Sequence, residues 1–365
     1  MTKAQIGEHV TPVTKWNPVK DAPDQELTYV DIASVSQTEK TVNGVSHILG
    51  AEAPSRARQI IKTGDVLVST VRPNLNAVAA VPEEMERATA STGFCVLRPN
   101  QKTLDSRYLY HWVRSPIFIS SMVKQATGQS YPAVSDRVIK QSELPLPPLE
   151  EQRRIAAILD QADALRRLRQ RVIDRLNTLD RTIFYKMFGD PDTNPKGIEK
   201  ISLGEIIKVK SGDGLTTAQM LPGPYPVYGG NGINGSHSDG NVEENTIVIG
   251  RVGVYCGAVH VSRTSSWVTD NALIVYKKRD IDTFYLAAAL RVANLNRYAS
   301  RSAQPLVSGN RIYPVSILVP DREHQARFGE IVKRYEIECE KQLKSLRKCE
   351  DVFSALQQHA FRGEL

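Results

Sequence analysis

Residues 148–188 read PLEEQRRIAAILDQADALRRLRQRVIDRLNTLDRTIFYKMF, and this stretch decides the fold. It contains no glycine, and no proline after Pro148. Apolar residues recur at intervals of three and four, with Arg169 at one seam position; they are Ile155, Ile158, Ala162, Leu165, Val172, Leu176, Leu179 and Ile183. Such a heptad stripe is typical of a helix that packs along another helix. Pro148 and the acidic residues after it suit a helix start, so we expect a helix over residues 150–188, about 58 Å long.

A second stripe runs from near Asp321 to about Phe361. Its positions are Phe328, Ile331, Val332, Tyr335, Cys339, Leu343, Leu346, Phe353, Leu356 and Ala360. The spacing is less regular than in the first stripe, with Gln342 and Glu350 near the seam, which indicates a stutter. Because neither helix can bury its stripe alone, we expect the two to pair as an antiparallel coiled coil.

The segments that precede the two helices repeat each other in order. Residues 132–135 (PAVS) return as residues 305–308 (PLVS), 173 positions later, and Gln152 returns as Gln325 at the same offset. Further upstream the matches continue with drifting offsets, which insertions in loops between duplicated elements would produce; they pair residues 108–110 with 285–287, 64–68 with 245–249, and 6–8 with 203–205. The sequence therefore predicts an internal duplication.

The rest of each half reads as mixed α and β structure. Short β-branched runs predict strands at 66–71, 77–81, 94–97, 246–250, 257–261 and 272–276, and helices are expected at 106–114 and 283–292. We therefore predict an α+β fold: two mixed α/β domains joined by two long antiparallel helices, with a pseudo-twofold internal repeat. The expected boundaries are a first domain at 1–147, a first long helix at 148–188, a turn-rich linker at 189–197, a second domain at 198–320 and a second long helix at 321–365.

Composition excludes several classes of protein. The 365 residues are 41% hydrophobic and 24% charged, which suits globular domains with packed cores rather than a disordered chain. No segment approaches the roughly 18 apolar residues of a membrane span, and the first residues lack a secretion signal, so we expect a cytoplasmic protein without a membrane partner. Lys and Arg exceed Asp and Glu by 47 − 40 = 7, which favours a polyanionic partner, although an ordinary basic protein would carry the same excess.

No motif for catalysis, metal binding or cofactor binding stands out. The sequence lacks the phosphate-binding GxxxxGK[ST], the zinc-binding HExxH and an NPPY-type methyltransferase motif, and the glycines at 212 and 214, and at 250, 253 and 257, do not form the dinucleotide-binding GxGxxG. The four cysteines form no CxxC pair and have no zinc-ligand spacing to histidine, which predicts reduced, incidental thiols. Residues 236–239 (SHSD) contain the residue types of a catalytic triad, but neighbours on a Gly/Asn-rich loop indicate a turn instead. We therefore expect a non-catalytic chain without a cofactor or a metal.

Several local motifs resemble one known family. They are PLPPLEEQRRI at 145–155, FGDP at 188–191, NPKG at 194–197, YPVYGGNGI at 225–233 and WVTDN at 267–271. Together with the order domain, helix, domain, helix, they resemble the DNA specificity subunits of type I restriction–modification systems, over essentially the whole chain. The start of the second helix, VPDREHQ at 319–325, keeps the pattern more loosely.

The resemblance implies a division of labour among subunits. A specificity subunit reads double-stranded DNA, whereas two methyltransferase subunits, which bind S-adenosylmethionine, and ATP-driven restriction (translocase) subunits perform the chemistry. Each domain would read one half of a split, asymmetric target, while the helices would set the gap and dock the methyltransferase subunits. Readers on one face of DNA must be about one turn, roughly 10 bp, apart, which agrees with two domains separated by long helices.

Polar loops supply the candidate DNA contacts. Phosphates are bound by Arg, Lys and backbone N–H groups, and base edges by Arg, Asn, Gln and small polar side chains. The candidates are Arg72, Asn74, Thr127, Gln129, Ser130 and Tyr131 in the first domain, and Tyr228, Asn231, Arg251, Arg301, Ser302 and Gln304 in the second. The alternative for each loop is a turn that satisfies its own backbone, and for the Gly/Asn loop at 228–234 the two interpretations have equal weight.

Two other classes of function stay open. A coiled-coil adaptor with globular ends would bind proteins and show no salt-dependent affinity for DNA. A self-sufficient DNA enzyme would methylate or cleave DNA as the purified chain alone.

Overall fold

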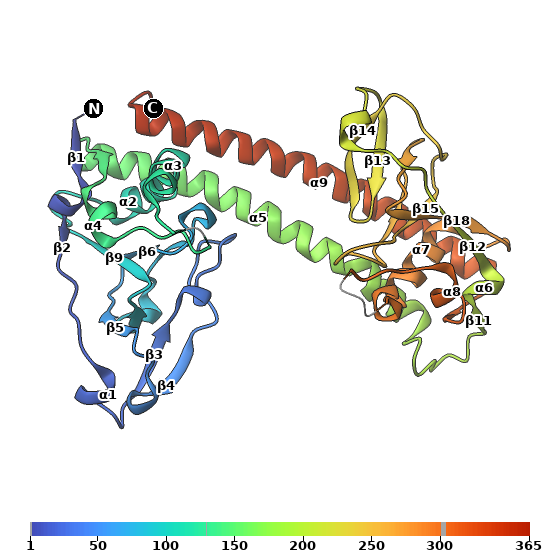
Figure 1. Cartoon of the computed structure of the whole chain (residues 1–365), viewed down its shortest axis with the longest axis horizontal. Helices are drawn as coiled ribbons and strands as arrows, with labels where there is room; N and C mark the ends of the chain where they lie inside the picture. The colour runs from blue at the N-terminus through green and yellow to red at the C-terminus, as the bar shows by residue number, and fades with distance from the viewer. Residues whose placement is uncertain (1, 129, 301–303) are drawn as a thin grey trace. The chain divides into compact units, whose positions relative to one another are not determined.

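The computed structural model describes residues 2–128, 130–300 and 304–365. The chain divides into two compact units, each built from one globular part and one half of each long helix (Figure 1). The first unit comprises Met1–Gln170 and Lys344–Leu365, and the second comprises Arg171–Leu343. The boundary between the units therefore falls inside the helices α5 (Leu149–Phe188) and α9 (Arg322–Arg362).

The first unit contains two four-stranded sheets and one two-stranded sheet. The strand orders are β2-β9-β6-β7, β4-β3-β8-β5 and β1-β10. The bounds are β1 Lys3–Gln5, β2 Val10–Thr11, β3 Glu26–Val30, β4 Ser46–Leu49, β5 Ala57–Ile60, β6 Val66–Ser69, β7 Val78–Ala80, β8 Thr89–Ser91, β9 Phe94–Pro99 and β10 Glu143–Pro145. The short helices are α1 Pro18–Asp21, α2 Ser106–Val113, α3 Pro116–Gln125 and α4 Asp136–Gln141.

Strand β6 is buried on both faces and separates two cores. Val66 and Val68 pack with α2, α3 and the long helices, whereas Leu67 packs with Val30 of β3 and Ala90 of β8. Because successive side chains of a strand point to opposite faces, one continuous apolar run serves both cores. The strands expected at 66–71, 77–81 and 94–97 are present with somewhat different ends, as β6, β7 and β9, but the second sheet built from β3, β4, β5 and β8 was not expected.

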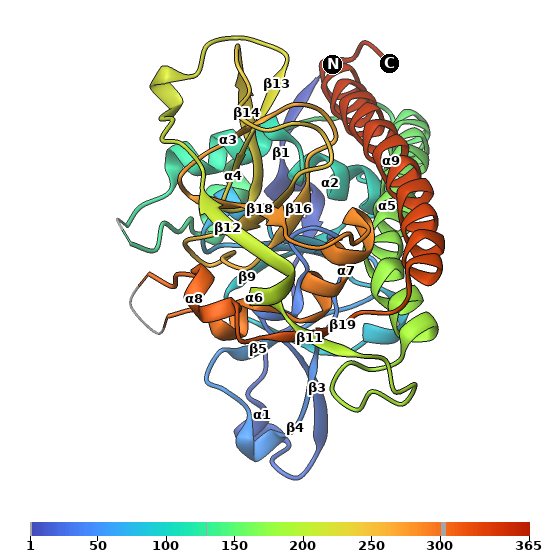
Figure 2. The same cartoon turned by 90° about the vertical axis from the view of Figure 1, so that its right-hand side faces the viewer.

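The second unit, which faces the viewer in Figure 2, contains sheets of four, three and two strands. The strand orders are β12-β18-β15-β16, β14-β13-β17 and β11-β19. The bounds are β11 Lys200–Ser202, β12 Ile207–Ser211, β13 Tyr225–Gly229, β14 Gly232–His237, β15 Ile247–Gly250, β16 Val259–Val261, β17 Trp267–Val268, β18 Ala272–Lys277 and β19 Ser316–Leu318, with helices α6 Leu203–Ile206, α7 Thr283–Val292 and α8 Gly309–Ile312. Here Ile247 and Ile249 face α7 and the long helices, whereas Val248 faces the sheet of β13 and β17.

In the first unit, the start of α5 packs against the end of α9. Ile155 and Leu159 share a core cluster with Phe361. Arg154 donates to the carbonyl of Leu365 at 2.9 Å, and the guanidinium of Arg166 lies 5.7 Å from the ring of Phe353. Residues further along α5 thus contact residues earlier in α9, so these two helix halves run antiparallel.

In the second unit, the end of α5 packs against the start of α9. Phe184 and Phe188 form an aromatic cluster with Phe328, with ring centroids 5.8 and 5.4 Å from it. The hydroxyl of Tyr335 donates to the carbonyl of Leu176. These two halves also run antiparallel.

The heptad stripe predicted for α5 is only partly the buried face. Ile155 is fully buried as predicted, but Leu159 is buried in place of Ile158, and Leu165 is 47% exposed. The reason is that the first half of α5 packs against the globular part, including Tyr108 and Leu109 of α2, as well as against α9. A helix with two neighbours buries a wider face than a strict two-position seam.

The two units share the way in which the globular part is joined to a long helix. Strand β1 pairs with β10 (Lys3 opposite Pro145), and β11 pairs with β19 (Lys200 opposite Leu318), both antiparallel. Tyr108 and Tyr285, each fully buried, donate their hydroxyls to the carbonyls of Pro145 and Leu318 at 2.9 and 2.6 Å. The repeated residues 108–110 and 285–287 thus contain the two tyrosines that make equivalent hydrogen bonds in the two units.

Candidate nucleic-acid interface

The first unit carries a loop that leaves β6 and is fastened to a second loop far along the chain. We call residues 70–76 the exit loop and residues 127–133 the return loop of this unit. The N–H of Arg72 donates to Pro132 O at 2.7 Å, and the N–H of Val134 donates to Thr70 O at 2.9 Å. The return loop is closed by two hydrogen bonds between Thr127 and Ala133, at 3.0 and 2.9 Å. These main-chain bonds bring the two predicted DNA-contacting segments together.

The predicted side chains of this unit lie at the surface of that loop pair. The guanidinium of Arg72 lies 4.8 Å from the ring centroid of Tyr131, whose side chain is 69% exposed. Asn74, Thr127 and Ser130 are also exposed, whereas the predicted contact Gln129 lies outside the described residues. An exposed arginine stacked on an exposed tyrosine presents both a cation and a flat apolar face, which suits contact with phosphates and bases.

Arg72 has an unusual backbone conformation. Its φ of 49° lies in the left-handed region, and it precedes a proline, which disfavours helical conformations in the residue before it. Such a conformation costs about 1–2 kcal/mol for a residue other than glycine, and backbone outliers of this kind cluster at functional sites. The N–H bond from Arg72 to Pro132 helps to hold the conformation.

The second unit fastens its loops in the same way. Its exit loop, residues 251–257, leaves β15, and its return loop includes Ser300 and residues 304–306. The N–H of Gly253 donates to Pro305 O at 3.0 Å, and the N–H of Val307 donates to Arg251 O at 2.8 Å. Gly253, with a φ of +85°, therefore occupies the backbone place that Arg72 occupies in the first unit.

Two predicted contacts of this unit lie on the loop pair, and two fall outside the description. Arg251 is half-buried, and one of its terminal nitrogens donates to Ser211 Oγ at 3.2 Å and to Asp270 O at 3.1 Å. Gln304 is exposed on the return loop. Arg301 and Ser302 lie outside the described residues. The hydrogen bonds fix the position of Arg251 relative to the sheet.

The predicted Gly/Asn loop is a β-hairpin, and it separates Tyr228 from Asn231. Strands β13 and β14 are joined by a two-residue turn in which Asn231 is exposed. Tyr228, by contrast, is only 5% exposed and packs with Val248 and Val268 between the two sheets. Burial raises the pKa of Tyr228. Its phenol thus lies between the two sheets rather than at the surface.

Sequence reasoning missed two exposed apolar residues in the second exit loop. Val254 is 82% exposed and Tyr255 is 58% exposed. The loop that carries them is closed by bonds from Cys256 N to Gly253 O at 3.0 Å and from Ala258 N to Tyr255 O at 3.1 Å. The available signal was an aromatic residue between two glycines in a loop that leaves a strand, Tyr255 between Gly253 and Gly257.

The end of the first exit loop is linked to α5 through Arg114. Asn76 ends this loop and donates its side-chain N–H to Arg114 O at 3.2 Å, while Lys40 donates to Asn76 O. Arg114 in turn donates to the buried carboxylate of Asp163 at 3.0 Å. The arginines around Asp163 outweigh the effect of its burial and hold its pKa below the ordinary value. Burial and the neighbouring arginines lower the pKa of Lys40 to about 8.

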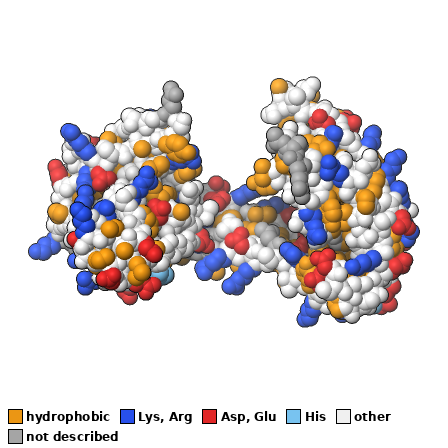
Figure 3. All heavy atoms as spheres, turned by 60° about the horizontal axis from the view of Figure 1, so that its bottom comes forward, with side chains coloured by type: hydrophobic (Ala, Val, Ile, Leu, Met, Phe, Trp, Pro, Cys, Tyr) orange, Lys and Arg blue, Asp and Glu red, His pale blue; other side chains and the backbone are white. Residues whose placement is uncertain are grey.

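Positive and negative side chains are mixed on the face of the protein that Figure 3 shows. Figure 3 shows Lys and Arg side chains scattered among Asp and Glu over one face of each unit. Among the residues that the structure describes, no group of three or more His, Cys, Asp and Glu side chains is placed to bind a metal ion. Within the same described ranges, no helix has both the length and the apolar character needed to cross a bilayer.

Comparison with solved structures gives the fold. The chain aligns over 100% of its length, and 98% of the other chain, with a structure described as "Structural basis underlying complex assembly and conformational transition of the type I R-M system", at 25% identity and a TM-score of 0.58. It also aligns over 99% of its length, and 96% of the other chain, with the type I restriction–modification S subunit from M. genitalium, at a TM-score of 0.67 and 18% identity. The latter likeness is one of fold alone.

Sequence comparison gives the family. The chain is 29% identical over 140 residues to the type I restriction enzyme EcoprrI specificity subunit of Escherichia coli, covering 37% of this chain and 35% of that protein. It is 29% identical over 193 residues to the putative MjaX specificity subunit of Methanocaldococcus jannaschii, covering 51% and 44%. The matches thus span a third to a half of these relatives. The family model "Type I restriction modification DNA specificity domain" matches residues 25–178 and again residues 195–346. With two copies of this domain over most of its length, the chain belongs to the type I restriction–modification DNA specificity family.

Proposed function

We propose that this chain is the DNA specificity subunit of a type I restriction–modification complex and that each unit reads one half of a bipartite DNA target. The observation that carries the proposal is the shared loop frame of the two units. In both, an exit loop and a return loop are joined by equivalent main-chain hydrogen bonds, while the side chains they present differ. A common frame with different side chains suits two readers of unlike half-sites.

The side chains on each frame have the chemistry that DNA contact needs. In the first unit, Arg72, Asn74, Thr127, Ser130 and Tyr131 would meet the DNA, and Gln129 is proposed with them. In the second, Asn231, Arg251 and Gln304 would do so, with Arg301 and Ser302. Arginine binds guanine edges and phosphates, and Asn and Gln bind adenine edges. Because the two frames place these side chains differently, with Gly253 of the second unit at the backbone place of Arg72, the two half-sites should differ, which makes the target asymmetric.

We further propose that α5 and α9 pair along their whole length as an antiparallel coiled coil, with a pseudo-twofold relation between the units. This coiled coil would set the gap between the half-sites and dock two methyltransferase subunits, with restriction subunits joining the complex. Exposed apolar residues support the docking role, because water disfavours them and a partner would cover them; they are Leu165, Leu168 and Val352 in the first unit and Ile337 and Leu343 in the second. The chain itself would be non-catalytic and cytoplasmic.

Exchange of one reader tests the proposal. Residues 1–147 would be replaced by the corresponding domain of a homologue, and the chimera would be assembled with its methyltransferase subunits and supplied with genomic DNA. Mapping of methylated sites should show one changed half-site and one unchanged half-site. A change in both halves would contradict independent readers. Absence of salt-dependent DNA binding by the parent complex would favour the adaptor, and methylation or cleavage by the purified chain alone would favour an enzyme.

A further inference from the structure

The helices α2 and α7 carry an arginine at the same place of the internal repeat. Arg114 follows Tyr108 by 114 − 108 = 6 positions, and Arg291 follows Tyr285 by 291 − 285 = 6. The two tyrosines make equivalent hydrogen bonds in their units. Arg114 directly follows the last residue of α2, and Arg291 lies in the last turn of α7. The two arginines are therefore counterparts.

In the first unit, this arginine joins α5 to the exit loop through two different groups. The guanidinium of Arg114 donates to the carboxylate of Asp163 on α5 at 3.0 and 3.3 Å, and both side chains are buried. The main-chain carbonyl of Arg114 accepts the side-chain N–H of Asn76, the last residue of the exit loop, at 3.2 Å. A shift of Arg114 relative to α5 would therefore move the end of the loop that carries Arg72.

In the second unit, the counterpart makes the same connection with other atoms. Arg291 donates to the carboxylate of Asp180 on α5 at 3.4 Å. Its Nε donates at 3.1 Å to the carbonyl of Val259, the first residue of the strand that follows the exit loop. Asn296, shortly after α7, donates at 2.9 Å to the carbonyl of Cys256 inside the loop. Both units thus tie the exit loop to α5 at the end of the same helix.

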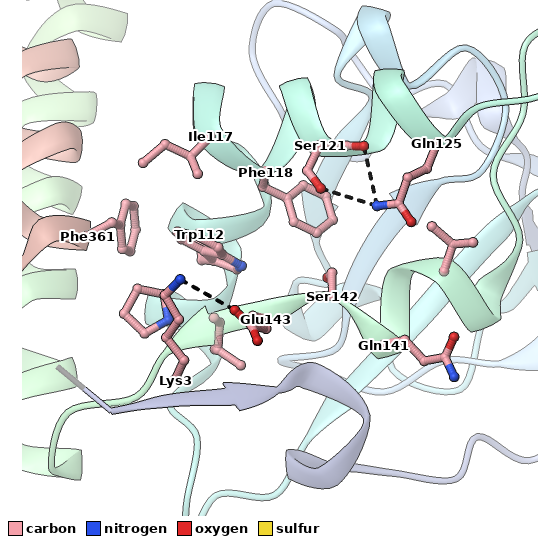
Figure 4. Close-up of a pocket in the computed structure, with 13 residues that line it drawn as sticks. Lys3, Trp112, Ile117, Phe118, Ser121, Gln125, Gln141, Ser142, Glu143 and Phe361 are labelled. Atoms are coloured by element: carbon pink, nitrogen blue, oxygen red, sulfur yellow. Dashed lines mark hydrogen bonds and ion pairs between the residues drawn. The ribbon is translucent and has the colours of Figure 1, made fainter.

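Apolar packing holds another side of the end of α2. Figure 4 shows Trp112 between Phe361 of α9 and Phe118 of α3, and its ring centroid lies 5.0 and 6.5 Å from theirs. A cavity of about 470 Å³ borders the same three rings. Because apolar contacts are not directional and the cavity leaves room beside them, this packing keeps α2 near α9 without fixing its position along α5.

The buried ion pair supplies the direction that the apolar contacts lack. A guanidinium presents its N–H groups in one plane, so it binds a carboxylate in a defined orientation. The cost of burying the two charges offsets most of their attraction, so the pair contributes geometry more than stability. Asp163 also accepts from Arg166 at 2.9 Å and from Arg167 at 3.0 Å. Its charge therefore stays compensated when Arg114 is replaced.

We propose that Arg114 and Arg291 are positioning residues for DNA recognition, each of which holds the end of its exit loop at a fixed place relative to α5. Loss of either arginine relaxes the selection of one half-site and leaves the other unchanged. Arg114 acts through Asn76 and the loop, because its own side chain is buried. The inference rests on the proposed DNA-reading function and adds to it residues that act from behind the exposed contacts.

The test measures half-site selection by the complex of the full chain with its methyltransferase subunits. Fluorescence anisotropy would give the affinity for the target duplex and for duplexes altered in one half-site, which the exchange of residues 1–147 assigns to a unit. Arg114→Met should lower the affinity ratio for the half-site of the first unit about tenfold, and Arg291→Met that of the second. Loss of folded protein alone would lower both affinities by the same factor and leave the ratio unchanged.

Arg107→Met is the control for Arg114→Met. Both arginines pair with an aspartate of α5, and their guanidinium carbons lie 4.6 and 4.5 Å from the ring centroid of Tyr110. Within the described ranges, only Arg114 of these two bonds to the exit loop. Arg107→Met should therefore keep both affinity ratios within about twofold of the parent.

Asn76→Gly tests the end of the loop without changing the buried charges. The φ of Asn76 is 50°, which glycine adopts freely, so the variant keeps the backbone conformation and loses the bond to Arg114. It should lower the same affinity ratio as Arg114→Met and speed hydrogen exchange in residues 70–76. The control is Asn245→Gly, at a φ of 60° before β15 and so at the strand end opposite to the second exit loop. This variant should change neither ratio.

The outcomes separate this inference from the proposed function. A parent complex that binds the altered duplexes as tightly as its target would contradict the proposed function, and the inference with it. A parent complex that selects its target, together with equal ratios for Arg114→Met and Arg107→Met, would overturn the inference alone. If Arg114→Met does not fold, an unchanged ratio in Asn76→Gly would overturn it as well.

Discussion

Gln152 and Gln325 make the same pair of hydrogen bonds at the starts of the two long helices. The side-chain oxygen of Gln152 accepts from Asp105 N at 2.9 Å, and its nitrogen donates to Pro147 O at 2.9 Å. Gln325 accepts from Asp282 N at 3.0 Å and donates to Pro320 O at 2.7 Å. Asp105 and Asp282 each cap the helix that follows, α2 and α7. One side chain thus joins the start of a long helix to the start of the helix packed against it.

Replacement of either glutamine by methionine should destabilise its own unit. Each change leaves a partly buried backbone N–H and a carbonyl without their side-chain partner, which costs about 1–3 kcal/mol. Chemical denaturation would measure the loss, and hydrogen exchange would locate it: Gln152→Met should weaken protection of α2, and Gln325→Met that of α7. Uniform loss of protection in both units after either change would contradict a local role.

Arg72→Gly should weaken DNA binding without weakening the fold. The equivalent backbone place in the second unit is already a glycine with positive φ. Removal of the side chain relieves about 1–2 kcal/mol of backbone strain in the folded chain. Two effects oppose this gain in stability: the stacking of Arg72 on Tyr131 is lost, and glycine gives the unfolded chain more conformational freedom. We expect a melting temperature within a few degrees of the parent and about tenfold lower affinity for a duplex carrying the methylated site. Unchanged affinity would show that Arg72 does not contact DNA.

Tyr255→Ala should also lower affinity for the specific duplex, with Tyr276→Ala as the matched control. The two tyrosines are 58% and 48% exposed, but Tyr276 lies in β18 and not in the exit loop. Loss of an aromatic side chain that the bound duplex covers costs about 1–3 kcal/mol. Fluorescence anisotropy at several salt concentrations should show weaker binding with an unchanged salt slope, since Tyr255 is uncharged. Similar losses in the two variants would argue against a specific contact.

The titration of Lys40 should make the first unit more stable at alkaline pH. Its pKa of about 8 in the folded chain lies below the ordinary value of an unfolded lysine, so the unfolded state binds more protons between these values. Stability therefore rises as the pH increases from about 8 to 10, and Lys40→Met should lack this increment. Because Lys40 is only half-buried, we expect a difference of about 1–2 kcal/mol between the parent and the variant over this range. Parallel stability curves from urea denaturation would contradict the assignment.

The sequence predicted the central strands and the paired helices of each unit because their signals are local. Strand β15 is a β-branched run, and α7 begins after an aspartate that caps it. The repeat of residues 132–135 at 305–308 was also visible in the sequence, but the sequence did not indicate that these residues bond to the exit loops. Those residues pair with exit loops more than 50 positions away, through main-chain atoms that leave no residue-type signature.

The site was predicted less well, for physical reasons that differ from residue to residue. Tyr228 stands beside glycines, which indicated a loop, but it lies in β13, where residues 227–229 are all buried, and it packs between two sheets. Val254 and Tyr255 were overlooked because apolar residues usually belong to the core, and their exposure depends on the closed turn between Gly253 and Gly257. Exposure of this kind is a tertiary property.

The exit and return loops are held together by main-chain hydrogen bonds, and this has a consequence for the evolution of the chain. A bond from the N–H of Arg72 to the carbonyl of Pro132 survives most changes of side chain, as does the bond from Gly253 to Pro305. Mutations at exposed loop positions therefore have little effect on folding, and selection acts on them through their effect on the proposed DNA recognition. Such a scaffold can accumulate new preferences quickly, whereas its glutamines and tyrosines at the helix junctions should change slowly.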